Sequence, residues 1–266
     1  MKKRKMFIAA AAVMSMILTA GSFSAFAAQG AASDLDAIKE KGAIVVGITD
    51  FAPMDYKDDE GEWIGFDADL AKAFAASLGV EIELVEIEWD NKILELDGKT
   101  IDCVWNGMTL TNEVKAAMET SNAYCNNAQV VVLPAAKAAD YPDVASISAL
   151  TFAVEAGSAG EAVIDELGYN KTAVTSQADT LLEVAAGTSD AAVIDALMAA
   201  AMVGEGTSYE DLTYTFSLNS EEYGVGFRKG TDLAAALNEF LAKAYQDGSM
   251  MQIAETYGVQ AAIIPQ

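Results

Sequence analysis

The sequence predicts an α/β fold of two lobes joined by two crossing segments. Short apolar strands alternate with helices from residue 43 to about residue 133, and the alternation starts again at residue 151. The Ala- and Pro-bearing stretch 134–142 interrupts the pattern between the two runs. Strands that alternate with helices favour a parallel sheet covered on its faces. Ligands of such open sheets bind outside the carboxyl ends of the strands, so we expect a cleft between the lobes.

The first run begins with the buried apolar strand 43–48. The helix 67–78 carries Leu70, Phe74 and Leu78 along one face and ends at Gly79. Thr111 is well placed as the N-cap of a later helix. The remaining elements expected here are the strands 80–87, 101–105 and 128–133 and the helices 92–96 and 112–119.

The second run begins with the apolar strand 151–154. The segments 212–216 and 223–228 resemble strands that return across the molecule, and residues 233–257 form a helical tail broken near Gly248. The remaining elements expected here are the strands 172–174 and 191–194 and the helices 159–167, 178–186 and 196–202.

The N-terminus has the three parts of a secretory signal peptide. Four basic residues at positions 2–5 precede an apolar run to about Leu18, and Ala25-Phe-Ala27 supplies small residues for cleavage after Ala27. The apolar run is too short to span a bilayer comfortably. We therefore expect signal peptide 1–27 and a mature protein that is secreted, in the periplasm or at the extracellular face of the cell envelope, without direct membrane insertion.

Composition narrows the function further. Removal of residues 1–27 takes the formal charge from −24 to −28, and such acidity disfavours nucleic acid and anionic lipid as partners. The absence of histidine excludes an imidazole base and a His/Cys zinc site, so we expect no metal and no cofactor. The only cysteines, Cys103 and Cys125, are either a disulfide or two buried thiols.

Residues 151–195 contain a candidate site for a small charged molecule. The turn Gly157-Ser-Ala-Gly160-Glu161 follows a strand and opens a helix, which is a place where free backbone N–H groups, such as that of Ala159, can bind an anion. Ser158 and Glu161 also have the spacing of a capping box, a purely structural role. Asp195 ends a second strand and is either a helix cap or the counter-ion of an ammonium group. The anion-binding turn and the Asp195 carboxylate together suit the two opposite charges of a zwitterion.

The first run offers a second set of polar groups at strand ends. Asn106, Gly107, Met108 and Thr109 directly follow the strand 101–105, and the alternative is a simple strand-to-helix turn. In the loop after the first strand, Phe51 is placed to stack on a ligand. Two tryptophans share that possibility but are more typical of a core: Trp89 and Trp105.

One sequence motif covers most of a predicted helix, the segment 65–74, GFDADLAKAF. Six further segments accompany it, in order along almost the whole mature chain: 51–53, 101–102, 106–109, 154–158, 190–195 and 223–229. The first motif is similar to the signature of family 3 extracellular solute-binding proteins, the polar amino-acid receptors of ABC importers, and the other segments resemble the same family.

The resemblance implies a periplasmic-binding-protein fold type II, with lobe 1 at 28–127 plus 224–266 and lobe 2 at 128–223. It implies a monomeric, non-enzymatic receptor that closes over a small polar amino acid or related zwitterion and delivers it to the membrane permease of an ABC importer. By position, it implies stacking by Phe51, first-lobe polar contacts from Asn106 and Thr109, a second-lobe hydroxyl from Ser158, and pairing of Asp195 with the α-ammonium group. Asp67 and Asp69 would be structural.

One position departs from the family pattern. Members usually have an arginine that clamps the ligand carboxylate where this chain has Val114, and the mature chain's only arginine, Arg228, is not used for that purpose in the family. Either Thr109 and backbone N–H groups hold the carboxylate, or a lysine such as Lys92 or Lys115 replaces the arginine, or the ligand is not a standard α-amino acid.

Alternatives remain for ligand and function. The acids Asp55, Glu95 and Glu155 are candidates to select a cationic or amide side chain. A periplasmic cyclohexadienyl dehydratase acting on prephenate or arogenate would resemble such a receptor throughout. A soluble sensor that presents its ligand to a receptor kinase or chemoreceptor is a third interpretation.

Overall fold

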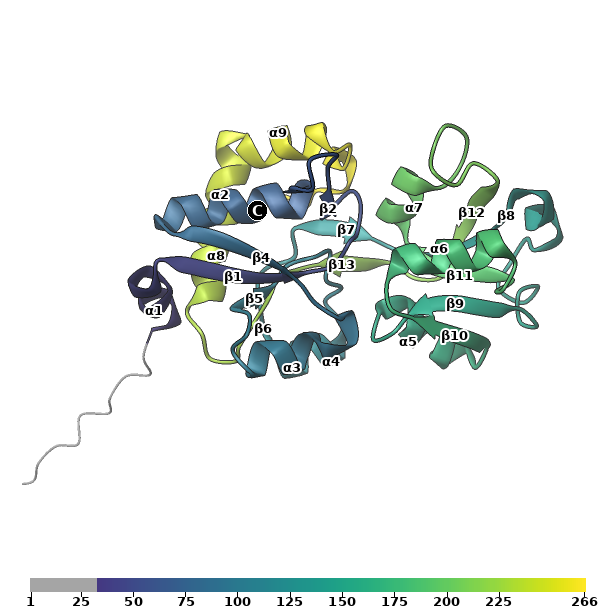
Figure 1. Cartoon of the computed structure of the whole chain (residues 1–266), viewed down its shortest axis with the longest axis horizontal. Helices are drawn as coiled ribbons and strands as arrows, with labels where there is room; N and C mark the ends of the chain where they lie inside the picture. The colour runs from purple at the N-terminus through teal and green to yellow at the C-terminus, as the bar shows by residue number, and fades with distance from the viewer. Residues whose placement is uncertain (1–32) are drawn as a thin grey trace, which may run out of the picture. The chain divides into compact units, whose positions relative to one another are not determined.

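The computed structural model describes residues 33–266, and the signal peptide expected at residues 1–27 lies outside the described residues. The described chain forms two sheet-containing lobes, each built on a sheet of five strands (Figure 1). Between residues 33 and 266 there is no helix with the length and apolar character required to cross a membrane.

The first sheet has the strand order β4 (Glu81–Glu86), β1 (Ala43–Ile48), β5 (Cys103–Val104), β14 (Gly226–Phe227), β6 (Glu119–Thr120). One side of it is parallel, because β1 pairs in parallel with β4 and β5. The other side is antiparallel, because β14 pairs antiparallel with β5 and β6. The helices in this part are α1 (Asp34–Lys41), α2 (Phe66–Leu78), α3 (Lys92–Asp97), α4 (Asn112–Ala117), α8 (Leu233–Asp247) and α9 (Ser249–Thr256), with the short hairpin β2 (Tyr56–Lys57) and β3 (Trp63–Ile64).

The second sheet repeats this arrangement. Its strand order is β10 (Asn170–Val174), β9 (Thr151–Glu155), β11 (Ala191–Asp195), β8 (Gln129–Pro134), β12 (Leu212–Ser217). Strand β9 pairs in parallel with β10 and β11, and β8 pairs antiparallel with β11 and β12. Its helices are α5 (Ala159–Leu167), α6 (Gln177–Ala186) and α7 (Ala196–Met202).

Two short antiparallel strands, β7 (Cys125–Asn127) and β13 (Glu221–Tyr223), connect the sheets and lie between them in Figure 1. The expectation that 212–216 returns across the molecule is wrong, because β12 pairs with β8 inside the second sheet. The reason is burial: Leu212 is buried, and Phe216 packs against the apolar core of that sheet. The lobe boundaries at 127/128 and 223/224 stay predictions.

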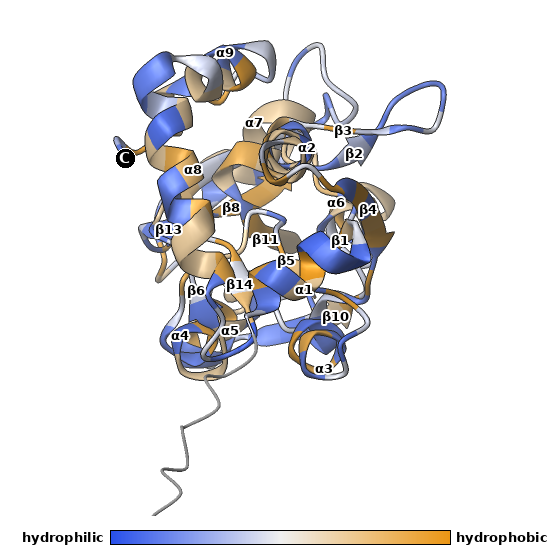
Figure 2. Cartoon of the chain, turned by 90° about the vertical axis from the view of Figure 1, so that its left-hand side faces the viewer, coloured by the Kyte–Doolittle hydropathy of each residue, from blue (hydrophilic) through white to orange (hydrophobic). Residues whose placement is uncertain are grey.

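Burial on both faces explains the apolar strands. In β1, Ile44, Val46 and Ile48 belong to one core cluster, whereas Val45 points to another. In a strand, successive side chains point to opposite faces, so an unbroken apolar run requires cover on both sides. Figure 2 shows α8 and α9 with one hydrophobic and one hydrophilic side, as helices that cover a sheet require.

Local capping signals are confirmed. Thr111 Oγ1 accepts a hydrogen bond from the Val114 N–H at 3.1 Å at the start of α4. Gly79 and Gly248 both have left-handed backbone conformations at helix ends, and Gly248 separates α8 from α9. The helical tail therefore breaks where the sequence places a residue without a Cβ.

The two cysteines are free and buried, Cys103 on β5 and Cys125 on β7. Burial raises the pKa of both thiols well above the ordinary value. Of the two alternatives left by the sequence, the structure has the buried thiols.

Candidate functional site

A cleft of about 540 Å³ is lined by loops from both lobes. Strand-end loops supply its walls, as expected for ligands of open α/β sheets. The structure brings all eight residues singled out as ligand contacts to this cleft: Phe51, Asn106, Gly107, Met108, Thr109, Ser158, Ala159 and Asp195. Their roles as ligand contacts stay predictions.

Asp195 is the last residue of β11 and is 3% exposed. Its carboxylate accepts hydrogen bonds from Gln129 Nε2 at 3.0 Å and from Tyr223 Oη at 2.8 Å, and also from the amides of Asn127 and Gln177. It makes no side-chain cap bond to α7. Burial raises the pKa of Asp195 to about 8, and the negative charge of Glu221 is the second largest cause of this rise. The structure therefore favours a fixed, desolvated carboxylate over a helix cap.

The turn before α5 uses part of its hydrogen-bonding capacity internally. Ser158 Oγ accepts from the Glu161 N–H at 3.0 Å, and Glu161 Oε2 accepts from the Gly157 N–H at 2.7 Å. The Ser158 N–H donates to the Glu155 carbonyl at 3.2 Å. Within residues 33–266, the N–H groups of Ala159 and Gly160 have no such acceptor. The capping role of Ser158 is therefore present, and two N–H groups remain for an anion.

Asn106 fixes the loop after β1. Its Oδ1 accepts from the Thr49 N–H at 2.9 Å, and its Nδ2 donates to Asp55 Oδ2 at 2.7 Å and to the Thr49 carbonyl at 3.1 Å. Because both ends of the amide are engaged, Asn106 shapes the cleft wall through its neighbours.

Phe51 lies directly on the backbone of Gly107. A Cβ at Gly107 would lie 2.3 Å from the Phe51 ring, so only glycine fits beneath the ring. The Gly107 N–H donates to Asp67 Oδ2 at 2.6 Å, and Tyr124 Oη donates to the same oxygen at 2.7 Å. Burial raises the pKa of Asp67 to about 7. Asp67 therefore holds the loop that contains Gly107 in place, which agrees with the structural role expected for it.

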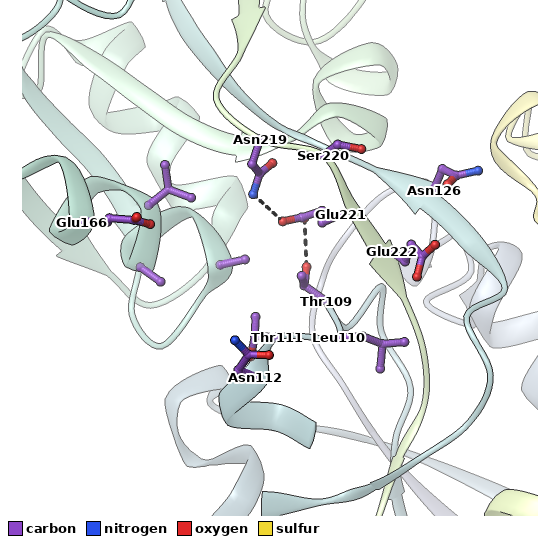
Figure 3. A pocket seen from close by; sticks show the side chains of 13 residues that line it. Thr109, Leu110, Thr111, Asn112, Asn126, Glu166, Asn219, Ser220, Glu221 and Glu222 are labelled. Atoms are coloured by element: carbon purple, nitrogen blue, oxygen red, sulfur yellow. Dashed lines mark hydrogen bonds between the residues drawn. The ribbon is translucent and has the colours of Figure 1, made fainter. Parts of the chain in front are cut away.

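Thr109 connects the cleft to the crossing strands. Its hydroxyl donates to Glu221 Oε1 at 2.9 Å, and Asn219 Nδ2 donates to the other oxygen of Glu221 at 2.9 Å (Figure 3). Asn127 and Gln129 also donate to Glu221 Oε1, at 2.7 and 2.8 Å. An adjoining hollow of about 500 Å³ is lined by Thr109, Asn219 and Glu221, among others, and by one side of α5.

Lys92 reaches across the cleft from α3. Its Nζ donates to the Gly157 carbonyl of the other lobe at 2.8 Å and to the Trp89 carbonyl at 3.1 Å, and lies 4.7 Å from the Trp89 ring centroid. Burial lowers its pKa, against the opposing effect of Glu155 and other acids. Of the two lysines considered as substitutes for an arginine, only Lys92 lines the cleft, as Val114 also does, whereas Lys115 is exposed on α4.

Arg228 has a structural role outside the cleft lining. It donates to the Ile101 carbonyl at 2.7 Å and forms an ion pair with Asp102 at 3.2 Å. Among the acids considered for selectivity, Asp55 is bonded to Asn106 and Glu95 to Thr100, and neither lines the cleft. Glu155 does line it.

The sequence did not single out the residues that surround Asp195. Asn127 and Gln129 interrupt an otherwise apolar strand region, and this is a signal that could have identified them. The others carried no local signal, because they come from distant segments: Gln177, Glu221 and Tyr223.

The family model for bacterial extracellular solute-binding proteins, family 3, matches residues 44–260. The chain belongs to this family. The L-cystine-binding protein of Escherichia coli strain K12 is 27% identical to this solute-binding protein over 250 residues, covering 92% of each chain.

Two solved structures show the same fold. A mutant of ArgBP from T. maritima is 31% identical, with a TM-score of 0.79 over 84% of this chain and 98% of the other. A histidine-bound substrate-binding protein of an ABC uptake transporter from Streptococcus pneumoniae is 27% identical, with a TM-score of 0.77 over 87% and 98%. This solute-binding protein therefore has the type II periplasmic-binding-protein fold, and its family and relatives are binding proteins, not enzymes.

Proposed function

We propose that this solute-binding protein captures a small polar amino acid outside the cytoplasm and, as a monomer, delivers it to the membrane permease of an ABC importer. The observation that carries the proposal is the Asp195 carboxylate, buried at the cleft wall and held by four donors. A carboxylate fixed in a desolvated site binds an ammonium group strongly, because its charge is not screened by water. The names of the relatives, which bind cystine, arginine or histidine, support the same ligand class.

The opposite end of the ligand is a carboxylate in this proposal. The free N–H groups of Ala159 and Gly160 at the start of α5 are its partners, helped by the helix dipole. Phe51 packs on the ligand from the first lobe, beside Thr109 and the backbone of Gly107 and Met108. Ligand contacts with both walls add to the direct hydrogen bond from Lys92 Nζ to the Gly157 carbonyl and so favour the closed arrangement further, and closure is the signal that the permease recognises.

Calorimetric titration of the mature protein with the standard amino acids and cystine tests this proposal. We expect a subset of these to bind with a 1:1 ratio and to raise the free energy of unfolding by about 2.7 kcal/mol at a concentration of 100 Kd. Asp195→Asn is expected to weaken binding about 30-fold or more, because the ammonium group loses its charged partner. The matched control is Asp165→Asn, an exposed acid on the same cleft lining.

Two results would reject the proposal. One is a folded protein that binds none of these compounds. The other is an Asp195→Asn variant that binds as tightly as the Asp165→Asn control. Incubation with prephenate and arogenate in the same buffer tests the dehydratase alternative, and we expect no turnover of either compound.

A further inference from the structure

Glu155 is a buried carboxylate that lines the cleft beside Asp195. It is the last residue of β9, which pairs in parallel with β11, the strand that ends at Asp195. Neighbouring strands lie about 4.8 Å apart. The two carboxyl groups therefore start from adjacent strand ends, within reach of two amino groups of one small molecule.

Unlike the carboxylate of Asp195, the Glu155 carboxylate is not fully satisfied. Glu155 is 3% exposed, and its Oε1 has no hydrogen-bond partner among residues 33–266. Asp55 and Asp67 also have one such oxygen, but both lie outside the cleft lining. Glu155 is thus the acid that presents an unpartnered buried oxygen at the cleft.

The charges around Glu155 neutralise it only in part. The described cleft lining has one basic side chain, Lys92, whose charge lowers the pKa of Glu155 but whose Nζ donates to the Gly157 and Trp89 carbonyls and not to Glu155. Another acid of the lining, Glu161, has Lys171 as its ion-pair partner at 2.7 Å. The lining acids are Asp90, Glu113, Glu155, Glu161, Asp165, Glu166 and Asp195.

An uncompensated carboxylate at a buried position is unfavourable, and the cost is relieved by a proton or by a cation. Burial raises the pKa of Glu155 to about 8, and the negative charge of Asp195 is the second largest cause of this rise. A ligand with a neutral side chain leaves this carboxyl without a charged partner. A ligand with a second cationic group supplies one.

On the basis of the proposed function, we propose that Glu155 binds a second cationic group of the ligand. The cleft then selects small molecules with two cationic nitrogen groups, one at Asp195 and the other at Glu155. Two sources share this chemistry: an amino acid with a basic side chain, and a diamine without a carboxylate.

Titration calorimetry with paired ligands tests the proposal on the mature protein. Lysine, ornithine and arginine are compared with the neutral isosteres norleucine, glutamine and citrulline, and with cadaverine and agmatine as diamines. We expect at least one dicationic compound to bind about 100-fold more tightly than its neutral isostere. Binding of lysine but not cadaverine identifies the amino acid as the source, and the reverse identifies the diamine.

Glu155→Gln tests the residue itself, because it keeps the shape and removes the charge. We expect it to weaken the dicationic ligand about 30-fold and to weaken neutral amino acids far less, because these have no second cationic group to pair with Glu155. The control Glu166→Gln removes an exposed charge from the same lining and is expected to change affinity by about twofold or less. Thermal unfolding of each variant checks that it folds, and the wild-type preference between isosteres tests the proposal even if Glu155→Gln does not fold.

The outcomes separate the two proposals. If neutral amino acids bind as tightly as dicationic ones, or if Glu155→Gln weakens both classes equally, the role of Glu155 is rejected while the amino-acid receptor stands. If the folded wild-type protein binds neither amino acids nor diamines, the proposed function is rejected together with this inference.

Discussion

Gly157→Ala is expected to impair closure of the two lobes. A Cβ at this position would lie 2.8 Å from Asp90 Oδ1 and 2.9 Å from Asp90 Cα, which belongs to the other lobe. Rotation of the Asp90 side chain moves its oxygen away but not its backbone. The lobes must therefore separate slightly at the point where Lys92 Nζ donates to the Gly157 carbonyl at 2.8 Å.

The effect of Gly157→Ala on stability and ligand affinity has two contributions, and a control variant can separate them. Gly157 has φ +71°, and a left-handed conformation costs a residue with a Cβ about 1–2 kcal/mol whether the lobes are closed or open. Loss of a hydrogen bond from a charged donor adds about 1.5–3 kcal/mol in the closed form alone. We therefore expect ligand affinity to fall about tenfold or more, in addition to a lower midpoint of thermal unfolding.

Gly168→Ala is the matched control. Gly168 has φ +70° at the end of α5, and a Cβ there would have no atom within 4 Å, so this variant has the strain without the contact. Both variants should lower the unfolding midpoint similarly, but only Gly157→Ala should weaken ligand binding and reduce compaction in small-angle X-ray scattering. Equal ligand affinities for the two variants would refute the reasoning.

Three further predictions address the cleft and its support. Lys92→Met should weaken ligand binding about tenfold because the bond across the cleft is lost, whereas Lys115→Met on the exposed side of α4 should not; calorimetry measures both. The pKa values of Asp195 and Glu155 are raised to about 8 from 3.8 and 4.5, so the folded protein binds more protons than the unfolded chain between about pH 4 and pH 8. The free energy of unfolding of the ligand-free protein should therefore decrease as pH rises through this window, and thermal scans should show a shallower decrease for Glu155→Gln; an identical slope would contradict the assignment. Ser158→Ala should lower the free energy of unfolding by about 1 kcal/mol in denaturant titrations, because α5 loses its N-cap.

Interactions between residues close in the sequence were predictable. The cap at Thr111 and the helix break at Gly248 depend on three or four neighbouring residues, and both occur as expected. The apolar run in β1 predicted a strand buried on both faces, because its length and composition fit little else. These features depend on local backbone geometry and on burial, both of which can be estimated from a short window of sequence.

Parts of the site were predictable for a related reason. Ligands of open α/β sheets bind outside the carboxyl ends of the strands, so polar residues at strand ends, such as Thr109 in the first run and Asp195 in the second, were expected to face the cleft. The structure places both on the cleft. The number of hydrogen bonds that each residue already makes was not predictable. Asn106, for example, has its amide fully engaged by Thr49 and Asp55.

The sequence by itself determined the alternation of strands and helices, the caps, and which loops follow strand ends, because each depends on residues within a few positions. The tertiary structure decided the environment of Asp195, whose donors Gln129, Gln177 and Tyr223 are 66, 18 and 28 positions away. It also decided that Glu155 retains an unpartnered oxygen and that Lys92 reaches the opposite lobe. Desolvation and charge compensation depend on which distant segments pack together, and only the folded chain specifies that packing.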